Sequence, residues 1–325
     1  LYNAAGTEQT AKTFGLAPYG YVQDRVANLF GAAFESMGSF SLKVEIPQGV
    51  DVKPSASVVD NLTGDPVTVT GQIPPATRIL VPSVARIRGE AGTDWHSDVQ
   101  LTNPDRMAHT WRVEFLPKQT LPAASRTVTV GPAQSLRLQR QGETPDVVAW
   151  IYDPLQAPDA SGVLRITSED QSGVLPLVGA RTYNLTASGT YGQGIPALSA
   201  SDGAAPTGEY RELLITGMSS EDWARSNLGF VNLGTGNVNF EVYFYDEFGN
   251  MLNPGGQAYP LFLGPGGWDQ DKLENRALNQ WGVAVPSMRL ISAVVRVTSG
   301  GPGFAYASVV DSLTGNARAN EIIRE

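Results

Sequence analysis

The 325-residue chain has no cysteine, only two histidines, and few charged residues, which make up 17% of its length. The lack of cysteine excludes disulfide bonds, thiolate catalysis and cysteine-ligated metals, and it leaves the compartment open. The formal net charge is −9, so the chain lacks the basic surface that neutralises phosphates, and we expect no nucleic-acid partner. No run approaches the roughly 18 apolar residues that a spanning helix needs, so we also expect no membrane span.

Turn and strand formers are what the chain has in quantity. It contains 35 glycines and 22 prolines, and 42% of its residues are hydrophobic. This composition is typical of a packed core built from many short strands joined by turns. We therefore expect an all-β fold.

A nine-residue sequence occurs near both ends of the chain. Residues Ala56–Gly64 read ASVVDNLTG, and Ala307–Gly315 read ASVVDSLTG. About midway between them, Ala180–Gly189 read ARTYNLTASG, a degraded third copy. The spacing predicts three copies of a unit of roughly 125 residues. In each copy the shared sequence forms a strand and a turn, where Asp60 and Asp311 are expected to accept hydrogen bonds from backbone amides.

Further segments align between the second and third copies. The aligned pairs are Asn103 with Asn232, Trp111–Phe115 with Phe240–Phe244, and Val130-Gly-Pro with Leu263-Gly-Pro. Alternating apolar residues in the second of these pairs predict one strand in each copy. Many short strands at this spacing favour tandem immunoglobulin-like antiparallel β-sandwiches.

Each copy also contains one short amphipathic segment. These segments begin at Gln23, Thr144 and Gln270. In the second copy, Thr144 followed by Pro145 predicts a helix N-cap with proline at the first helical position. In the third copy, Asp271 and Glu274 have the spacing of a capping box. We therefore expect one short helical segment in each repeat.

The three copies predict three domains of unequal completeness. Residues 1–74 form the C-terminal half of a β-sandwich repeat, whereas 75–206 and 207–325 each form a complete repeat. Small, polar, proline-containing stretches at 72–77 and 200–207 are typical of linkers. We therefore expect the repeats to be strung like beads.

The first repeat lacks the counterparts of residues 208–243, so it is expected to leave a core face open. Three explanations stay open. The chain is a cut piece of a longer protein with more copies, or a neighbouring molecule supplies the missing strands, as in strand-complemented filaments. In the third explanation the first repeat packs its open face on the second.

The pattern resembles a family. The strings that carry the resemblance are ILVPSVARIRGEAGTDWHSDVQLTNP, RSNLGFVNLG and FAYASVVDSLTG. They are similar to uncharacterised tandem immunoglobulin-like β-sandwich repeats of secreted bacterial proteins. The resemblance covers nearly the whole chain and implies an extracellular or cell-surface setting. Its motifs are structural, so it implies no residue-level activity.

Neither histidine has the surroundings of a catalytic group. His96 precedes Ser97 and Asp98 in the sequence Trp-His-Ser-Asp. A catalytic triad must converge in space, whereas neighbours on a strand point to opposite faces. We expect a surface position for His96 and no catalytic role for it or for His109.

Two other patterns have ordinary structural explanations. Asp269, Asp271 and Glu274 could offer oxygen ligands to Ca²⁺, but helix capping accounts for two of them. The Asn-Leu-Thr sequons at Asn61 and Asn184 fit the glycosylation pattern, which is common by chance in turns, and glycosylation is left open. We assign no catalytic, cofactor-binding or metal-binding residue.

One strand offers a candidate interface. Between Glu241 and Asp246, alternation buries Val242 and Phe244 and turns Tyr243 and Tyr245 outward. Outward tyrosines suit a carbohydrate platform or a protein interface. Packing against a neighbouring copy or under a loop is the alternative.

Taken together, these features predict a non-enzymatic protein that is secreted or displayed on a bacterial surface. Tandem copies give length rather than a pocket, which favours a structural or adhesive role, with filaments formed by completion of the half domain. The alternative is a carbohydrate- or protein-binding module of a larger secreted protein. The expected partners are other copies of the chain or a surface glycan or protein, with no cofactor.

Overall fold

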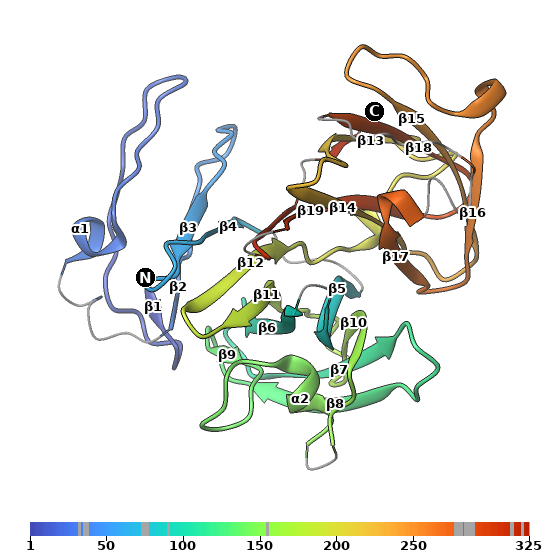
Figure 1. Cartoon of the computed structure of the whole chain (residues 1–325). Coiled ribbons are helices and arrows are strands. Elements are labelled where there is room, and N and C mark those ends of the chain that lie inside the picture. The colour runs from blue at the N-terminus through green and yellow to red at the C-terminus, as the bar shows by residue number, and fades with distance from the viewer. Residues whose placement is uncertain are drawn as a thin grey trace.

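The computed structural model describes residues 1–31, 34, 39–72, 78–89, 92–153, 156–275, 282, 290–312, 315–319 and 322–324. These residues form antiparallel strands with a few short helices, which confirms the expected all-β fold. We keep the names first, second and third repeat for residues 1–74, 75–206 and 207–325, whose boundaries stay a prediction. In Figure 1 the blue first repeat and the orange-to-red third repeat lie on different sides of the second.

The second repeat is a continuous antiparallel sheet that folds over on itself. Its spatial order is β12-β11-β6-β5-β10-β7-β8, with β9 beside β6. The bounds are β5 (Ile79–Arg88), β6 (Asp94–Thr102), β7 (His109–Pro117), β8 (Ala124–Val130), β9 (Ser135–Arg137), β10 (Ala160–Ser168), β11 (Leu177–Thr186) and β12 (Gly189–Ile195). β5 and β6 pair only near Ile87 and Trp95, and a core that includes Val99 and Trp111 lies between the strands on either side of this joint.

The third repeat is built from two separate sheets. One has the order β16-β15-β18-β13-β21 and the other β17-β14-β19-β20. The bounds are β13 (Glu212–Met218), β14 (Ala224–Asn232), β15 (Val238–Tyr245), β16 (Tyr259–Leu263), β17 (Trp268–Lys272), β18 (Ile291–Gly300), β19 (Gly303–Asp311), β20 (Ala317–Ala319) and β21 (Ile322–Arg324). Short 3-10 turns occupy Ala200–Asp202 and Pro254–Gly256. Phe230, Phe240 and Val295 belong to the core between the sheets, so the repeat is sandwich-like.

Two buried asparagines make equivalent contacts in the second and third repeats. The Asn103 amide nitrogen lies 2.7, 3.0 and 2.9 Å from the carbonyl oxygens of Met107, Val130 and Gly131. The Asn232 amide nitrogen lies 2.7, 3.2 and 2.7 Å from those of Gly236, Leu263 and Gly264. A buried carbonyl without a partner is costly, so each asparagine ties two turns to its strand. The alignment of these residues in sequence is therefore reproduced in space.

The first repeat forms two separate strand pairs. Its elements are β1 (Tyr2–Asn3), α1 (Val26–Phe30), β2 (Phe40–Ser41), β3 (Ser55–Val59) and β4 (Pro66–Thr70), with β1 paired to β2 and β3 to β4. Core positions of the repeat are uncovered here. The segment Phe40-Ser-Leu-Lys-Val44 aligns with Ala293-Val-Val-Arg-Val297, and Leu42 is 40% exposed whereas Val295, at the same place, is fully buried. Leu16 is likewise exposed where Leu263 is buried. The core face of this repeat is thus open over the described residues.

Helical residues occur in all three of the predicted segments. In the first, α1 follows Arg25 without a side-chain cap. In the second, the helix is α2 (Val147–Ile151), and its N-cap is Asp146, whose carboxylate accepts a hydrogen bond from the Ala149 amide. The prediction of Thr144 as the N-cap was therefore wrong, because a carboxylate two residues later takes that place. In the third, Asp271 lies near the end of β17 paired with Leu228, and helical residues begin two positions later, at Leu273. Most of that segment lies outside the described residues.

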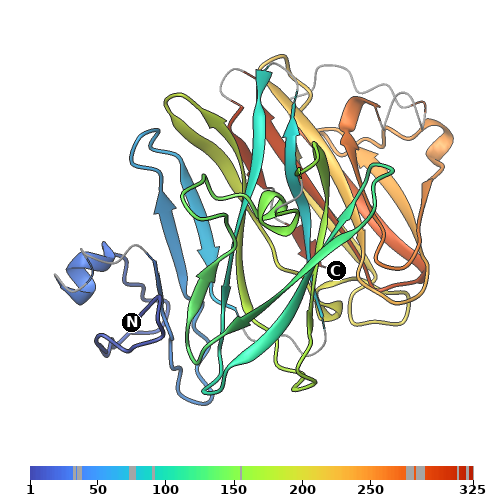
Figure 2. The same cartoon turned by 90° about the horizontal axis from the view of Figure 1, so that it is seen from below.

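The second and third repeats pack face to face, contrary to the expectation of separate beads. One buried apolar cluster joins Leu80, Val163 and Leu198 of the second repeat to Val231, Leu233, Phe304 and Tyr306 of the third. At its edge, the Lys118 ammonium lies 2.8 Å from the Asp269 carboxylate, and the Ser308 hydroxyl donates to Gln193. Figure 2 shows the strands of the two repeats side by side. Burial of these apolar side chains overrides the linker composition that suggested beads.

The first repeat contacts the second through its β3–β4 turn. The Asp65 carboxylate lies 3.0 Å from the Arg181 guanidinium and accepts a hydrogen bond from the Gly192 amide. The Thr63 hydroxyl donates to the Thr190 carbonyl. Val58 and other apolar side chains of the first repeat stay exposed, so this contact does not cover its open face.

Candidate functional site

Tyr243 and Tyr245 lie on the outward side of a central strand. Val242 and Phe244 are fully buried, as the alternation predicted, and the two tyrosines between and after them are half-buried. β15 lies between β16 and β18, so both tyrosines sit within a sheet rather than at its edge. The position agrees with the sequence prediction, and the role as an interface stays a prediction.

The tyrosines are part of a wider apolar surface on this sheet. Tyr243 stands opposite Val294, and Val294 stands opposite Leu214, so the three share one side. Phe262 of β16 lies on the same side and is 58% exposed. We call Leu214, Tyr243, Tyr245, Phe262 and Val294 the tyrosine face.

Charged side chains border the tyrosine face. The Tyr243 hydroxyl donates to the Glu241 carboxylate over 3.1 Å, and the Arg296 guanidinium lies 5.7 Å from the centre of the Tyr243 ring. Arg296 also donates to Glu212 over 2.6 Å. Burial, then the hydrogen bond to Glu241, raise the pKa of Tyr243. A flat aromatic surface with a charged border can bind a sheet, a peptide or a sugar ring.

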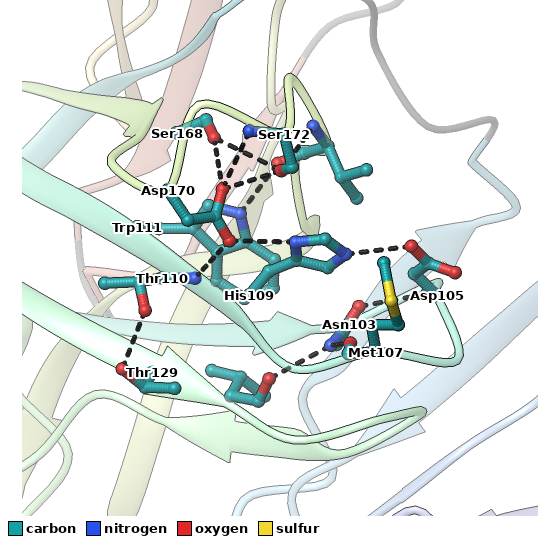
Figure 3. Close-up of polar contacts among 12 residues, drawn as sticks. Asn103, Asp105, Met107, His109, Thr110, Trp111, Thr129, Ser168, Asp170 and Ser172 are labelled. Atoms are coloured by element: carbon teal, nitrogen blue, oxygen red, sulfur yellow. Dashed lines mark hydrogen bonds and ion pairs between the residues drawn. The ribbon is translucent and has the colours of Figure 1, made fainter.

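A polar cluster of several hydrogen-bonded side chains surrounds His109 (Figure 3). His109 is 2% exposed, its Nδ1 lies 2.9 Å from Oδ2 of Asp170, and its Nε2 lies 2.8 Å from Oδ2 of Asp105. The Ser168 and Ser172 hydroxyls donate to the other oxygen of Asp170. Burial disfavours the charged imidazolium, but the two carboxylates outweigh it and raise the pKa of His109.

The His109 cluster is arranged as an ion-pair tie. A hydrolytic triad places a nucleophilic hydroxyl on one histidine nitrogen and a carboxylate on the other. Here both nitrogens face carboxylates, which only accept, so the imidazole is held as a double donor. The nearby serines are bonded to Asp170 and not to His109. This arrangement holds β7 against the turn after β10.

His96 was expected at the surface, and that prediction was wrong. Its side chain is 14% exposed, and its Nδ1 lies 2.8 Å from Oδ2 of Asp146, the N-cap of α2. Ser97 points to the other side of β6 and contacts Thr182. Burial lowers and the carboxylates of Asp146 and Asp94 raise the pKa of His96, with a net increase. The absence of a triad in this stretch agrees with the strand geometry.

A cavity of about 380 Å³ lies beside α2. Its lining residues are Arg126, Gln139, Arg140, Gln141, Glu143, Trp150 and Asp153. Arg126 donates to the Trp150 carbonyl over 2.9 Å, and Arg140 donates to the Ala149 carbonyl over 3.0 Å. These arginines satisfy the last carbonyls of a short helix, which accounts for their position without a ligand.

The remaining sequence candidates are dispersed. Asp269 pairs with Lys118, and the Asp271 carboxylate accepts from the Lys272 amide. Over the described residues no group of three metal-ligating side chains comes together, and none of the helices there is long and apolar enough to cross a membrane. Asn61 is exposed in a turn, whereas Asn184 is 4% exposed and accepts a hydrogen bond from the Asp94 amide.

The Asp60 prediction is confirmed, whereas the distant histidine partners Asp146 and Asp170 had no sequence signal. The Asp60 carboxylate accepts from the Leu62 and Thr63 amides, as a turn residue should. Asp146 and Asp170 lie 50 and 61 positions beyond their histidines. At such separations no local pattern links the partners.

Comparison with known proteins gives no assignment. No family model and no curated protein matches the chain. Two structures of the lectin from Pleurotus ostreatus, one in the apo form and one in complex with GalNAc, align with 11% and 10% identity. The alignments cover 78% of this chain and 76% and 77% of the lectin chains, with TM-scores of 0.18 and 0.17. Likeness at these scores carries no inference about this chain, and what the structure shows is an all-β, sandwich-like protein.

Proposed function

We propose that the chain is a non-enzymatic structural or adhesive repeat protein, secreted or displayed at a cell surface. The observation that carries the proposal is the sheet-to-sheet packing of the second and third repeats through one apolar cluster. Stacking of this kind turns repeats into a stiff, extended unit, since each repeat is fixed by its neighbour. The secreted setting rests on the sequence resemblance.

The proposal includes self-assembly through the open first repeat. Leu42, Val44 and Val58 occupy core positions of the repeat and are 40%, 51% and 57% exposed. Exposed apolar groups on a half-built sandwich favour association with strands that complete it. The partner is another copy of the chain, and the product is a filament.

Electron microscopy and sedimentation of the purified chain across concentrations test this assembly. The proposal predicts ordered filaments whose amount rises with concentration. Leu42→Glu with Val58→Glu should abolish them, because charge on the open face opposes burial. Thr70→Glu, on an exposed residue of β4, is the matched control and should leave them intact. A monomer at every concentration would contradict the assembly.

A second candidate function is glycan or protein binding at the tyrosine face. It is favoured by the half-buried Tyr243 ring held between Glu241 and Arg296. A glycan panel should then show saturable binding that is lost in the Tyr243→Ser, Tyr245→Ser double variant. Tyr19→Ser, on a fully exposed tyrosine of the first repeat, serves as the control. Absence of saturable binding would leave the structural role alone.

A further inference from the structure

The covered face of the second repeat has a counterpart in the third. Leu80 lies in β5 between the core residues Ile79 and Val81, and Leu214 lies in β13 between the core residues Leu213 and Ile215. After each leucine the pairing with the next strand, β10 or β18, shifts register at an irregularity. Leu80 and Leu214 therefore occupy the same position of the repeat.

The edges beside the two leucines correspond as well. Leu80 bridges to Leu198, which follows β12, and Leu214 pairs with Ile323 of β21, which follows β20. Both leucines thus lie on the outward side of a sheet, with a late segment of the same repeat along one edge. The tyrosine face is the third repeat's version of the surface around Leu80.

The two surfaces differ in what covers them. Leu80 is 1% exposed because the third repeat packs on it, with Val231, Phe304 and Tyr306 in the shared cluster. Leu214 is only half-buried, and Phe262 on the same side is largely exposed. Figure 1 places this sheet on the side of the third repeat away from the second.

Both surfaces combine apolar side chains with an ion pair. Opposite Leu80 stands Arg165, which donates to Glu114 over 2.7 Å. Opposite Leu214 stands Val294, followed by Tyr243 on the next strand. Each surface therefore includes an arginine–carboxylate pair, Arg165 with Glu114 in the covered one and Arg296 with Glu212 in the uncovered one. Docking of a partner would bury the apolar area that the tyrosine face exposes, and this burial favours association.

We infer that the tyrosine face is the docking site for a further β-sandwich repeat of the same kind, linked in tandem. This repeat would present apolar side chains at the positions of Val231, Phe304 and Tyr306, as the third repeat does to the second. The tyrosine face would thus continue the interface that already joins the second and third repeats. This inference rests on the proposed function because it assumes that the repeats act by stacking. It names the partner of Tyr243 and Tyr245 as a repeat rather than a glycan.

Engineered disulfides test the docking, because the chain has no native cysteine. In the native chain, Leu80→Cys is combined in turn with Val231→Cys and Phe304→Cys to find the pair that closes under mild oxidation. The full chain is then extended by a second copy of residues 207–325. In the extended chain, the first cysteine of the pair that closed replaces Leu214. The second replaces the residue of the added repeat that corresponds to Val231 or Phe304, whichever formed the disulfide with Leu80→Cys. The inference predicts closure within about tenfold of the control rate, since the geometry is repeated.

Each outcome has a separate meaning. Closure of the control pair without closure of the transplanted pair overturns this inference and leaves the stacking of the second and third repeats intact. Failure of both control pairs contradicts that stacking, and with it the proposed function. A cross-link between two separate molecules at Leu214, or glycan binding that protects Tyr243, also overturns the inference in favour of another occupant.

A second measurement needs no cross-link. Leu214→Glu is introduced into the native and the extended chain, and the unfolding temperature of each is compared with its parent. Docking predicts a drop larger by several degrees in the extended chain, where Leu214 would be fully covered, than in the native chain, where it is half-buried. If Leu214→Glu lowers the unfolding temperature equally in the two chains, the inference is overturned. This includes the case in which the added repeat does not fold and so leaves Leu214 uncovered.

Discussion

Nδ1 of His109 lies 2.9 Å from Oδ2 of Asp170, a residue 61 positions further along the chain. With Nε2 held 2.8 Å from Asp105, the buried ring bridges two carboxylates and ties β7 to the turn after β10. The imidazole of His109 can carry a positive charge, and both carboxylates are negatively charged at neutral pH. The stabilisation that these contacts give therefore depends on pH.

Stability should fall as the pH rises above about 6.5, because of His109. The pKa of His109 is raised in the folded chain above its ordinary 6.5. Its contribution is therefore full below about pH 6.5 and is lost as the pH rises through the folded pKa. Chemical unfolding at closely spaced pH values should show stability falling in this window. His109→Gln should lower stability at pH 6 by about 2 kcal/mol and flatten the fall.

In acid, Asp170 of the same cluster gives stability the opposite dependence on pH. Hydrogen bonds from Ser172, Thr110 and Ser168 outweigh burial and hold the pKa of Asp170 well below its ordinary 3.8. This contribution is present above that ordinary value and is lost as the pH falls through the folded pKa. Asp170→Asn should therefore reduce the loss of stability on acidification below pH 4. The double variant His96→Gln, His109→Gln removes both histidines, so the loss of stability on acidification can be measured in it without histidine titration. If Asp170→Asn loses as much stability below pH 4 as the native chain does, Asp170 is not the source of that loss.

The buried asparagines should be equally important in two repeats. Asn103→Ala and Asn232→Ala each leave carbonyl oxygens without their buried donor. Each should cost about 2 kcal/mol in unfolding free energy. Asn239→Ala, at an exposed residue of β15, is the control and should change stability by less than about 0.5 kcal/mol. A large loss in only one of the two repeats would show that the networks are not equivalent.

The interface between the second and third repeats should couple their unfolding. Phe304→Ala removes a ring that is 4% exposed in the shared cluster and should cost about 3 kcal/mol. Calorimetry should then resolve separate transitions for the two repeats. Phe262→Ala removes the same ring from a 58% exposed position and should cost under about 1 kcal/mol. Similar losses in both variants would argue against a buried interface.

Gly229 should be intolerant of any side chain. It stands opposite Tyr306, and a Cβ there would lie 2.3 Å from Cζ of the Tyr306 ring. Gly229→Ala should displace that ring from its hydrogen bond with Trp268 and cost about 1–3 kcal/mol. Gly236→Ala, where nothing lies within 4 Å, is the control. Near-ultraviolet circular dichroism should report the displaced aromatics, and an unchanged spectrum would contradict the prediction.

Local sequence determined the strands and the repeat. Alternation alone placed Val242 and Phe244 in the core and Tyr243 and Tyr245 outside, because successive side chains of a strand point to opposite faces. Turn chemistry likewise predicted the Asp60 contacts. The sequence alignment paired Asn103 with Asn232, and the structure shows these two residues in matching buried networks. These features depend on residues close in the chain or on direct comparison of copies.

Tertiary structure decided the contacts between distant segments. Gln270, where the sequence predicted the start of a helical segment, lies in strand β17 because β14 pairs with it, and the helical residues begin only at Leu273. His96 and His109 each contact a carboxylate that lies 50 or 61 positions away in the chain, and no local pattern encodes such a contact. Leu80 and Leu214 hold the same position of the repeat, yet only Leu80 is covered. Burial depends on which surface reaches a side chain once the whole chain has folded, and periodicity carries no record of that.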